Sequence, residues 1–238
     1  MTAMALSLSA CAGGQTGGTR ESKKPSETES TQAESVQEAE STQTETLIQQ
    51  EGEAKLTKID HTAWKYQEED DVYYQIGIVY CETPVDTSYE TLSVFVPGAY
   101  MTGTDNGDGT YTCEWNLDGE INGYTADTAP IVMPINTPGY SAQASLTAYT
   151  SVTEYTEEGF VYVHAGCRGR DAGAPAGITD LKAAVRYIRY TEDTLPGDAE
   201  RIFTFGMSGG GAQSSLVGAT GDSELYDAYL DEMKLPVG

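Results

Sequence analysis

The spacing of hydrophobic residues changes once along the chain, near residue 129. Before that point, Val72–Tyr80, Tyr89–Pro97 and Tyr111–Trp115 are rich in Tyr and Val and alternate partly with polar residues. This pattern is typical of strands that bury one face. The stretch Met101–Thr110 contains glycines and the pairs Asn-Gly and Asp-Gly, which indicate turns. The sequence therefore predicts an antiparallel group of strands at the start of the folded part.

From Ala129 onward, apolar runs of strand length alternate with segments of helical character. Strands are predicted at 129–135, 159–165 and 201–205, and helices at 141–150, 178–190 and 212–219. Runs that are apolar at successive positions suit strands covered on both faces. The alternation of strand and helix predicts a mostly parallel sheet with helices on both faces. The predicted fold class is therefore α/β, with antiparallel strands at its N-terminal side.

The first residues have a different character. Residues 1–12 are small and apolar and contain Leu8-Ser9-Ala10-Cys11, which is similar to a bacterial lipobox. In a lipobox the cysteine is lipidated, so Cys11 is the predicted lipidation site and 1–12 a signal remnant. The apolar run is short and no basic residue precedes it, so an incidental cysteine is the alternative. A lipidated Cys11 predicts an exported cell-surface lipoprotein, held at the membrane by acyl chains only.

Residues 13–55 are rich in Ser, Thr, Glu, Gln and Gly and poor in aromatic and β-branched apolar residues. Such a segment buries too little apolar surface to offset the entropy of ordering it. We expect a disordered tether that spaces the following domain from an envelope.

Residues 56–238 are long enough for one sizeable core, and we assign them to one domain. They contain 28 acidic and 9 basic residues, a net charge of −19. This charge repels polyphosphate, so nucleic acid is not an expected partner. A neutral or aromatic substrate fits better, although acidic surfaces also serve solubility alone.

Cysteine usage is sparse in this domain. The domain contains three cysteines, Cys81, Cys113 and Cys167, so they cannot all form disulfides with one another. None has a His or Cys at a zinc-ligand spacing, and we predict no metal site and no cofactor.

The strongest chemical signal is Gly206-Met207-Ser208-Gly209-Gly210, a match to G-x-S-x-G. Strand-prone residues precede it and helix-prone residues follow it, which is the setting of a serine nucleophile on a sharp turn. On such a turn Ser208 projects alone, and the N–H of Gly209 at the helix N-terminus faces an oxyanion formed on the serine. The alternative is a glycine-rich loop with an ordinary serine.

Acyl transfer on a serine needs a second oxyanion donor. The loop Asn136–Tyr140 follows the first buried strand, and its Gly139 lets a backbone N–H approach a site without a side chain in the way. Pro138 has no N–H to donate. The competing interpretation is a Pro-Gly turn without chemistry.

Several segments together resemble bacterial tannases of the α/β-hydrolase superfamily, which are close relatives of feruloyl esterases. The resemblance runs from about residue 92 to 235 and rests on the order and spacing of 129–140, 166–170, 180–190, 195–198 and 206–211. It implies that Ser208 is the nucleophile and that Gly139 and Gly209 form the oxyanion hole. It also implies a carboxylic ester hydrolase acting on galloyl or hydroxycinnamoyl-type esters through an acyl-enzyme, with a small aromatic ester as its partner molecule.

The chain departs from this family in its triad. In α/β-hydrolases the acid and the histidine follow the serine in sequence, but no histidine follows Ser208 here. His61 precedes the predicted sheet. His164 ends a strand that lies, in the usual strand order, two strands from that of Ser208, roughly 10 Å away. We therefore expect an incomplete hydrolase domain without its C-terminal strands, completed by a missing C-terminal half or by a partner chain.

Two other functions fit the same sequence. One is a catalytically inactive surface lipoprotein that uses the hydrolase scaffold to bind phenolic or glycan ligands. The other is a serine peptidase of the same fold.

Overall fold

The computed structural model describes residues 56–221 and 223–235. The predictions for Cys11, the signal remnant and the tether over 13–55 lie outside the described residues.

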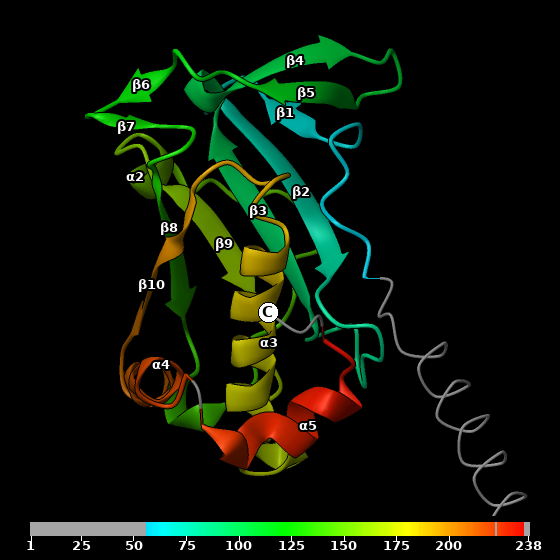
Figure 1. The fold of residues 1–238 in the computed structure, drawn as a ribbon, viewed down its shortest axis with the longest axis vertical. Coiled ribbons are helices and arrows are strands. Elements are labelled where there is room, and N and C mark those ends of the chain that lie inside the picture. The colour runs from blue at the N-terminus through cyan, green and yellow to red at the C-terminus, as the bar shows by residue number, and fades with distance from the viewer. Residues whose placement is uncertain (1–55, 222, 236–238) are drawn as a thin grey trace, which may run out of the picture. The chain divides into compact units, whose positions relative to one another are not determined.

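The described residues form a central mixed sheet of six strands (Figure 1). Its order is β1 (Lys65–Gln67), β2 (Val72–Val79), β3 (Thr91–Pro97), β9 (Val161–Ala165), β8 (Pro130–Ile135) and β10 (Asp198–Gly206). The pairs β1/β2, β2/β3 and β3/β9 are antiparallel, and β9/β8 and β8/β10 are parallel. It follows that β2, β9, β8 and β10 run in one direction, so the predicted antiparallel N-terminal strands and the parallel part are both confirmed.

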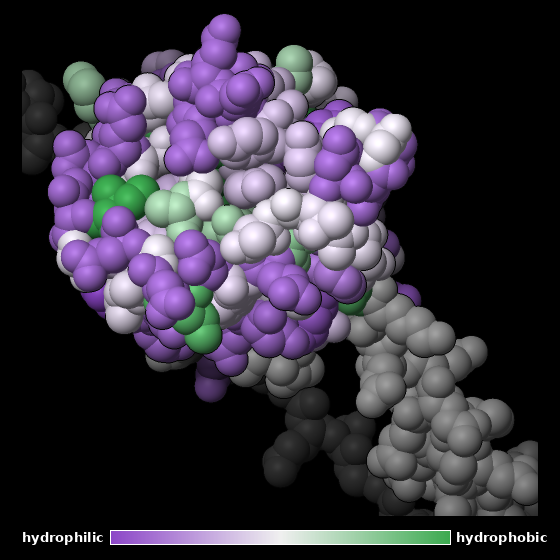
Figure 2. All heavy atoms as spheres, turned by 90° about the horizontal axis from the view of Figure 1, so that it is seen from above, coloured by the Kyte–Doolittle hydropathy of each residue, from purple (hydrophilic) through white to green (hydrophobic). Residues whose placement is uncertain are grey.

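Two small ribbons lie outside the central sheet. They are β4 (Met101–Asp105) with β5 (Tyr111–Trp115), and β6 (Glu120–Ile121) with β7 (Tyr124–Thr125). The prediction of turns throughout 101–110 was wrong for its first half, because residues 101–105 pair with β5 and only 106–110 form the turn. Figure 2 shows this end of the domain as mainly hydrophilic, with hydrophobic residues in small separated patches.

The part of the chain that the structure describes contains few helices. They comprise α2 (Thr153–Thr156), α3 (Ala176–Tyr190), α4 (Gly209–Ala219) and α5 (Asp227–Glu232), with short 3₁₀ turns η1 (Gly98–Tyr100), η2 (Pro138–Tyr140), η3 (Arg170–Ala172) and η4 (Glu224–Tyr226). The helix predicted at 178–190 is α3, and the one predicted at 212–219 is α4, which begins at Gly209.

The main core lies between the sheet and α3, which crosses one face of the sheet (Figure 1). β3 is buried along its whole length, as a central strand covered on both faces should be. On α3, the predicted apolar positions Leu181, Ala184 and Ile188 are almost fully buried. Burying a side chain such as Leu181 stabilises the fold by about 1.5–3 kcal/mol.

The other face of the sheet is covered without a long helix. The helix predicted at 141–150 is absent from the structure, and that segment is irregular. The backbones of Gln143 and Cys167 exchange two hydrogen bonds, each N–H donating to the other residue's carbonyl oxygen. The N–H of Ser145 donates to the carbonyl oxygen of Ser88. These hydrogen bonds to distant residues hold the segment extended, although its sequence favours a helix. Val72, Phe95 and Val152 form a second, smaller core here.

Strand β10 is the last strand of the sheet on its side within the described residues. Phe203 and Phe205 on this strand are 54% and 43% exposed. An apolar strand at a sheet edge is a surface on which further structure can pack.

Candidate active site

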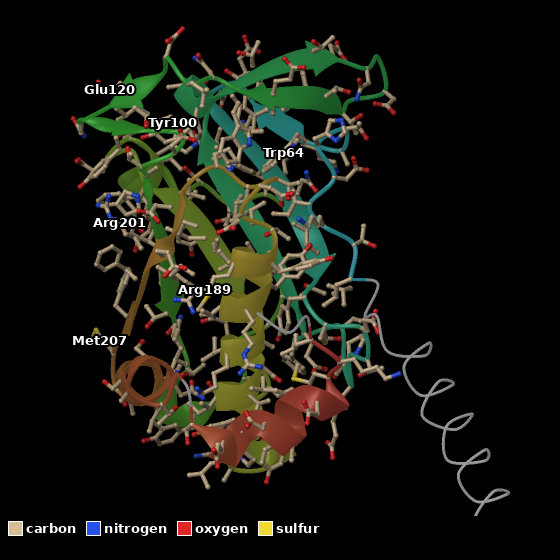
Figure 3. All side chains as sticks on the ribbon, in the orientation of Figure 1. Trp64, Tyr100, Glu120, Arg189, Arg201 and Met207 are labelled. Carbon is tan, nitrogen blue, oxygen red and sulfur yellow. The ribbon has the colours of Figure 1, made fainter. Side chains whose placement is uncertain are left out.

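Ser208 lies between the end of β10 and the start of α4, as the motif predicted. Its backbone has φ 53° and ψ −118°, a conformation that residues with a side chain rarely adopt. Such strain costs about 1–3 kcal/mol and persists only where the surroundings impose it. The neighbouring Met207 is 87% exposed and points away from the domain at the end of β10 (Figure 3).

Three glycines around Ser208 explain how the turn is held. A Cβ at Gly206 or Gly210 would lie 2.2 Å or 2.0 Å from the carbonyl oxygen of Ile135 in β8. A Cβ at Gly209 would lie 2.2 Å from the carbonyl oxygen of Thr137. The backbone of the turn therefore rests directly against β8 and the loop after it, and only glycine permits this approach.

The loop after β8 brings Gly139 next to the turn. Gly139 has φ 60° and ψ 23°, the left-handed conformation that glycine favours. Its nitrogen is 3.3 Å from the position a Cβ on Gly209 would take. Within the described residues, the N–H groups of Gly139 and Gly209 donate to no protein acceptor. Two unused backbone donors thus lie close together beside Ser208, which is the arrangement an oxyanion hole needs.

Two amide side chains fix this loop. The Oε1 of Gln143 accepts from the backbone N–H of Asn136 at 2.6 Å, and its Nε2 donates to the carbonyl oxygen of Ala165 at 2.7 Å. The Oε1 of Gln213, on α4, accepts from the Oγ1 of Thr137 at 2.5 Å. Neither glutamine was predictable from the sequence, because their partners are distant in sequence and no motif marks them.

The loop after β9 contacts the same region. Arg170 Nη1 donates to the carbonyl oxygen of Gly139 at 3.1 Å. Behind it, the buried Asp180 accepts from the backbone N–H of Arg168 and from the Arg168 guanidinium, both at 2.7 Å. Glu90, also buried, lies 3.4 Å from that guanidinium. A charge-assisted network of this kind fixes the loop that presents Arg170.

Neither histidine of the described residues is placed to act on Ser208. His61 is exposed and lies before β1. His164 lies on β9, and β8 separates β9 from β10, as predicted. Its Nε2 is 2.8 Å from the carbonyl oxygen of Ala144, so its ring is already engaged. Burial lowers the pKa of His164, which the bond to Ala144 partly offsets. A base must reach within about 3 Å of the serine oxygen, so His164 does not fill this role.

The cysteines do not supply an alternative nucleophile. Cys81, Cys113 and Cys167 are free and buried. Burial raises the pKa of Cys81 and Cys167 to about 12 and that of Cys113 to about 11. These thiols therefore stay protonated near neutral pH and are poor nucleophiles.

No cluster of three His, Cys, Asp or Glu side chains suited to a metal occurs among the described residues. In the same part of the chain, no helix combines the length and apolar character needed to cross a bilayer.

The fold is that of an α/β-hydrolase: it has the sheet order of this class, a strained serine between β10 and α4, and a glycine loop beside that serine. Solved structures with this fold belong to the same class. The chain matches the BD-FAE family over residues 117–235 and belongs to this feruloyl esterase-like family of α/β-hydrolases.

Solved tannases are similar to the chain over about three quarters of its length. A tannase from Fusobacterium nucleatum is 30% identical with a TM-score of 0.60, over 74% of this chain and 38% of that one. A tannin acyl hydrolase from Lactobacillus plantarum is 33% identical with a TM-score of 0.60, over 76% of this chain and 41% of that one. A comparison with curated protein sequences found no match. The chain thus spans about two fifths of the tannases it resembles.

Proposed function

We propose that this chain forms the nucleophile half of a serine carboxylic ester hydrolase. The observation that supports it most is Ser208, held in a strained turn beside the unused N–H groups of Gly139 and Gly209. Attack of the Ser208 oxygen on an ester carbonyl would form an acyl-enzyme and release the alcohol. The two N–H groups would stabilise the oxyanion that develops at the carbonyl oxygen.

We further propose that the substrate is an ester of a hydroxylated aromatic acid. The support is the similarity to tannases, for which one structure holds ethyl gallate and one holds 3,4-dihydroxybenzoate. The serine needs a base for efficient reaction, and neither histidine of the described residues reaches it. The base and its acid partner would come from a segment outside this sequence or from a second chain.

The test is acylation of Ser208 in the full chain, followed by intact mass. With p-nitrophenyl benzoate we expect one benzoyl group per chain, and none in Ser208→Ala. The matched control is Ser215→Ala, because this second serine of α4 is exposed and bonded to the Gly211 carbonyl oxygen. Acylation that persists in Ser208→Ala, or no acylation of the folded protein, would contradict the proposal.

The pH dependence of this acylation tests the missing base. If solvent hydroxide removes the serine proton, the rate rises about tenfold per pH unit above pH 7. A histidine base would instead give a plateau above its pKa. We expect the continuous rise, unchanged in His164→Gln.

A second candidate function is binding without catalysis, favoured by the distance of both histidines from Ser208. In that case the folded chain would bind methyl gallate reversibly, and no acyl adduct would form.

A further inference from the structure

A pocket of about 270 Å³ lies beside the candidate active site, bounded by η2, η3, the start of α3 and α4. Its lining includes Tyr140, Arg170, Gly177, Ile178, Gln213 and Leu216. A protein cavity of about 150 Å³ is enough to hold benzene. The pocket therefore has room for one aromatic ring with a substituent.

The pocket holds one oriented and unused donor. Gln213 is only 5% exposed, and Thr137 Oγ1 occupies its Oε1. Its Nε2 lies against Gly177, where a Cβ would be 2.7 Å away, and it donates to no acceptor among the described residues. A ligand oxygen in the pocket can accept a hydrogen bond from this amide, which the described residues leave without an acceptor.

The other walls set the kind of ligand. Ile178, Leu216 and the Tyr140 ring offer apolar surface, and the lining contains no acidic side chain. Arg170 brings a positive charge to a domain with a net charge of −19. An aromatic ring suits the apolar walls, and an anionic oxygen suits Arg170 and the Gln213 donor.

We propose that this pocket binds a small aromatic carboxylate, with the ring between Ile178 and Leu216 and the carboxylate beside Arg170 and Gln213 Nε2. The pocket adjoins the site of Ser208 through Tyr140, whose nitrogen is 2.6 Å from the position a Cβ on Gly209 would take. A carboxylate of this kind is also what hydrolysis of an aryl ester releases. Binding here is non-covalent and does not require the reaction on Ser208.

The probe is benzoate, titrated into the full chain by calorimetry and by saturation-transfer NMR. We expect saturable binding that is unchanged in Ser208→Ala, with benzyl alcohol and acetate at least tenfold weaker. Binding lost in Ser208→Ala would overturn the inference, because it would place benzoate on the serine itself. If acylation of Ser208 fails while benzoate still binds, only the proposed function is contradicted.

Variants locate the site. Arg170→Gln and Gln213→Met should each weaken benzoate about tenfold, the loss expected for one charge-assisted hydrogen bond. Leu216→Trp should fill the pocket and weaken benzoate without touching the polar groups, which keeps the test decisive if Gln213→Met fails to fold. Arg189→Gln and Leu225→Trp are matched controls at exposed positions elsewhere. Unchanged affinity in Arg170→Gln and Leu216→Trp, or no binding of benzoate at millimolar concentration, would overturn the inference.

Discussion

Gly210 shows how much of the candidate site depends on single residues. A Cβ there would sit 2.0 Å from the carbonyl oxygen of Ile135, so Gly210→Ala requires β8 or the turn to move. We expect a loss of about 2–4 kcal/mol in the free energy of unfolding. The measurement is urea denaturation followed by circular dichroism.

The control for this change lies on the same helix. Gly218 has nothing within 4 Å of its Cβ position, so Gly218→Ala should leave stability unchanged or raise it by up to about 1 kcal/mol through helix propensity. Equal losses in both variants would contradict the claim that contact with β8 restricts position 210.

His164 predicts a pH dependence of stability. Burial lowers the pKa of His164 in the folded state below its ordinary value of 6.5. As the pH falls below 6.5, the unfolded chain therefore binds a proton at His164 more readily than the folded chain does. Its contribution to stability is therefore present above pH 6.5 and is lost as the pH falls through the folded-state pKa. We expect His164→Gln to flatten the fall in unfolding free energy between pH 6.5 and 5. An unchanged slope would show that His164 accepts its proton without cost.

The sequence predicted that Ser208, Gly139 and Gly209 lie side by side, because tight backbone turns leave a local glycine signature. It did not predict the side chains that hold these turns. Gln213 and Arg170 act through partners more than 30 residues away, at Thr137 and Gly139. Such pairs become visible only when the fold brings β8, β9 and α4 together.

At the scale of elements, hydrophobic periodicity predicted the strands and helices whose side chains pack into the main core. The strands of the central sheet from β2 onward and the helix α3 follow it closely. It failed at 141–150, where Gln143 and Ser145 satisfy their backbone groups with distant segments. Local propensity is a weak guide when tertiary hydrogen bonds are available.

Strand β10 makes a prediction for purified protein. Its exposed edge, with Phe203 and Phe205, offers unpaired backbone groups and apolar surface to another copy of the chain. We expect concentration-dependent association in sedimentation velocity, reduced when Phe203→Lys and Phe205→Lys are combined. Leu117→Lys, at a 61% exposed position between β5 and β6, is the control. Association unaffected by the double change would exclude this edge as its cause.

At the scale of the whole molecule, the sequence predicted that one strand separates the strand of His164 from the strand of Ser208, and the sheet order confirms this. The sheet order places β10 beside β8, so Ser208 meets the Gly139 loop without any residue from elsewhere. Neither described histidine is placed to act as the base that would activate Ser208. Among the described residues, the unused N–H groups of Gly139 and Gly209 therefore adjoin Ser208, while neither histidine does.

The contact of the serine turn with β8 also limits how this site can change over evolutionary time. Gly206, Gly209 and Gly210 each abut backbone, so a larger residue at any of these positions would displace the turn. Met207 lies among them and faces solvent. Substitutions at Met207 and on the pocket walls can therefore change this surface while the turn that holds the serine keeps its position.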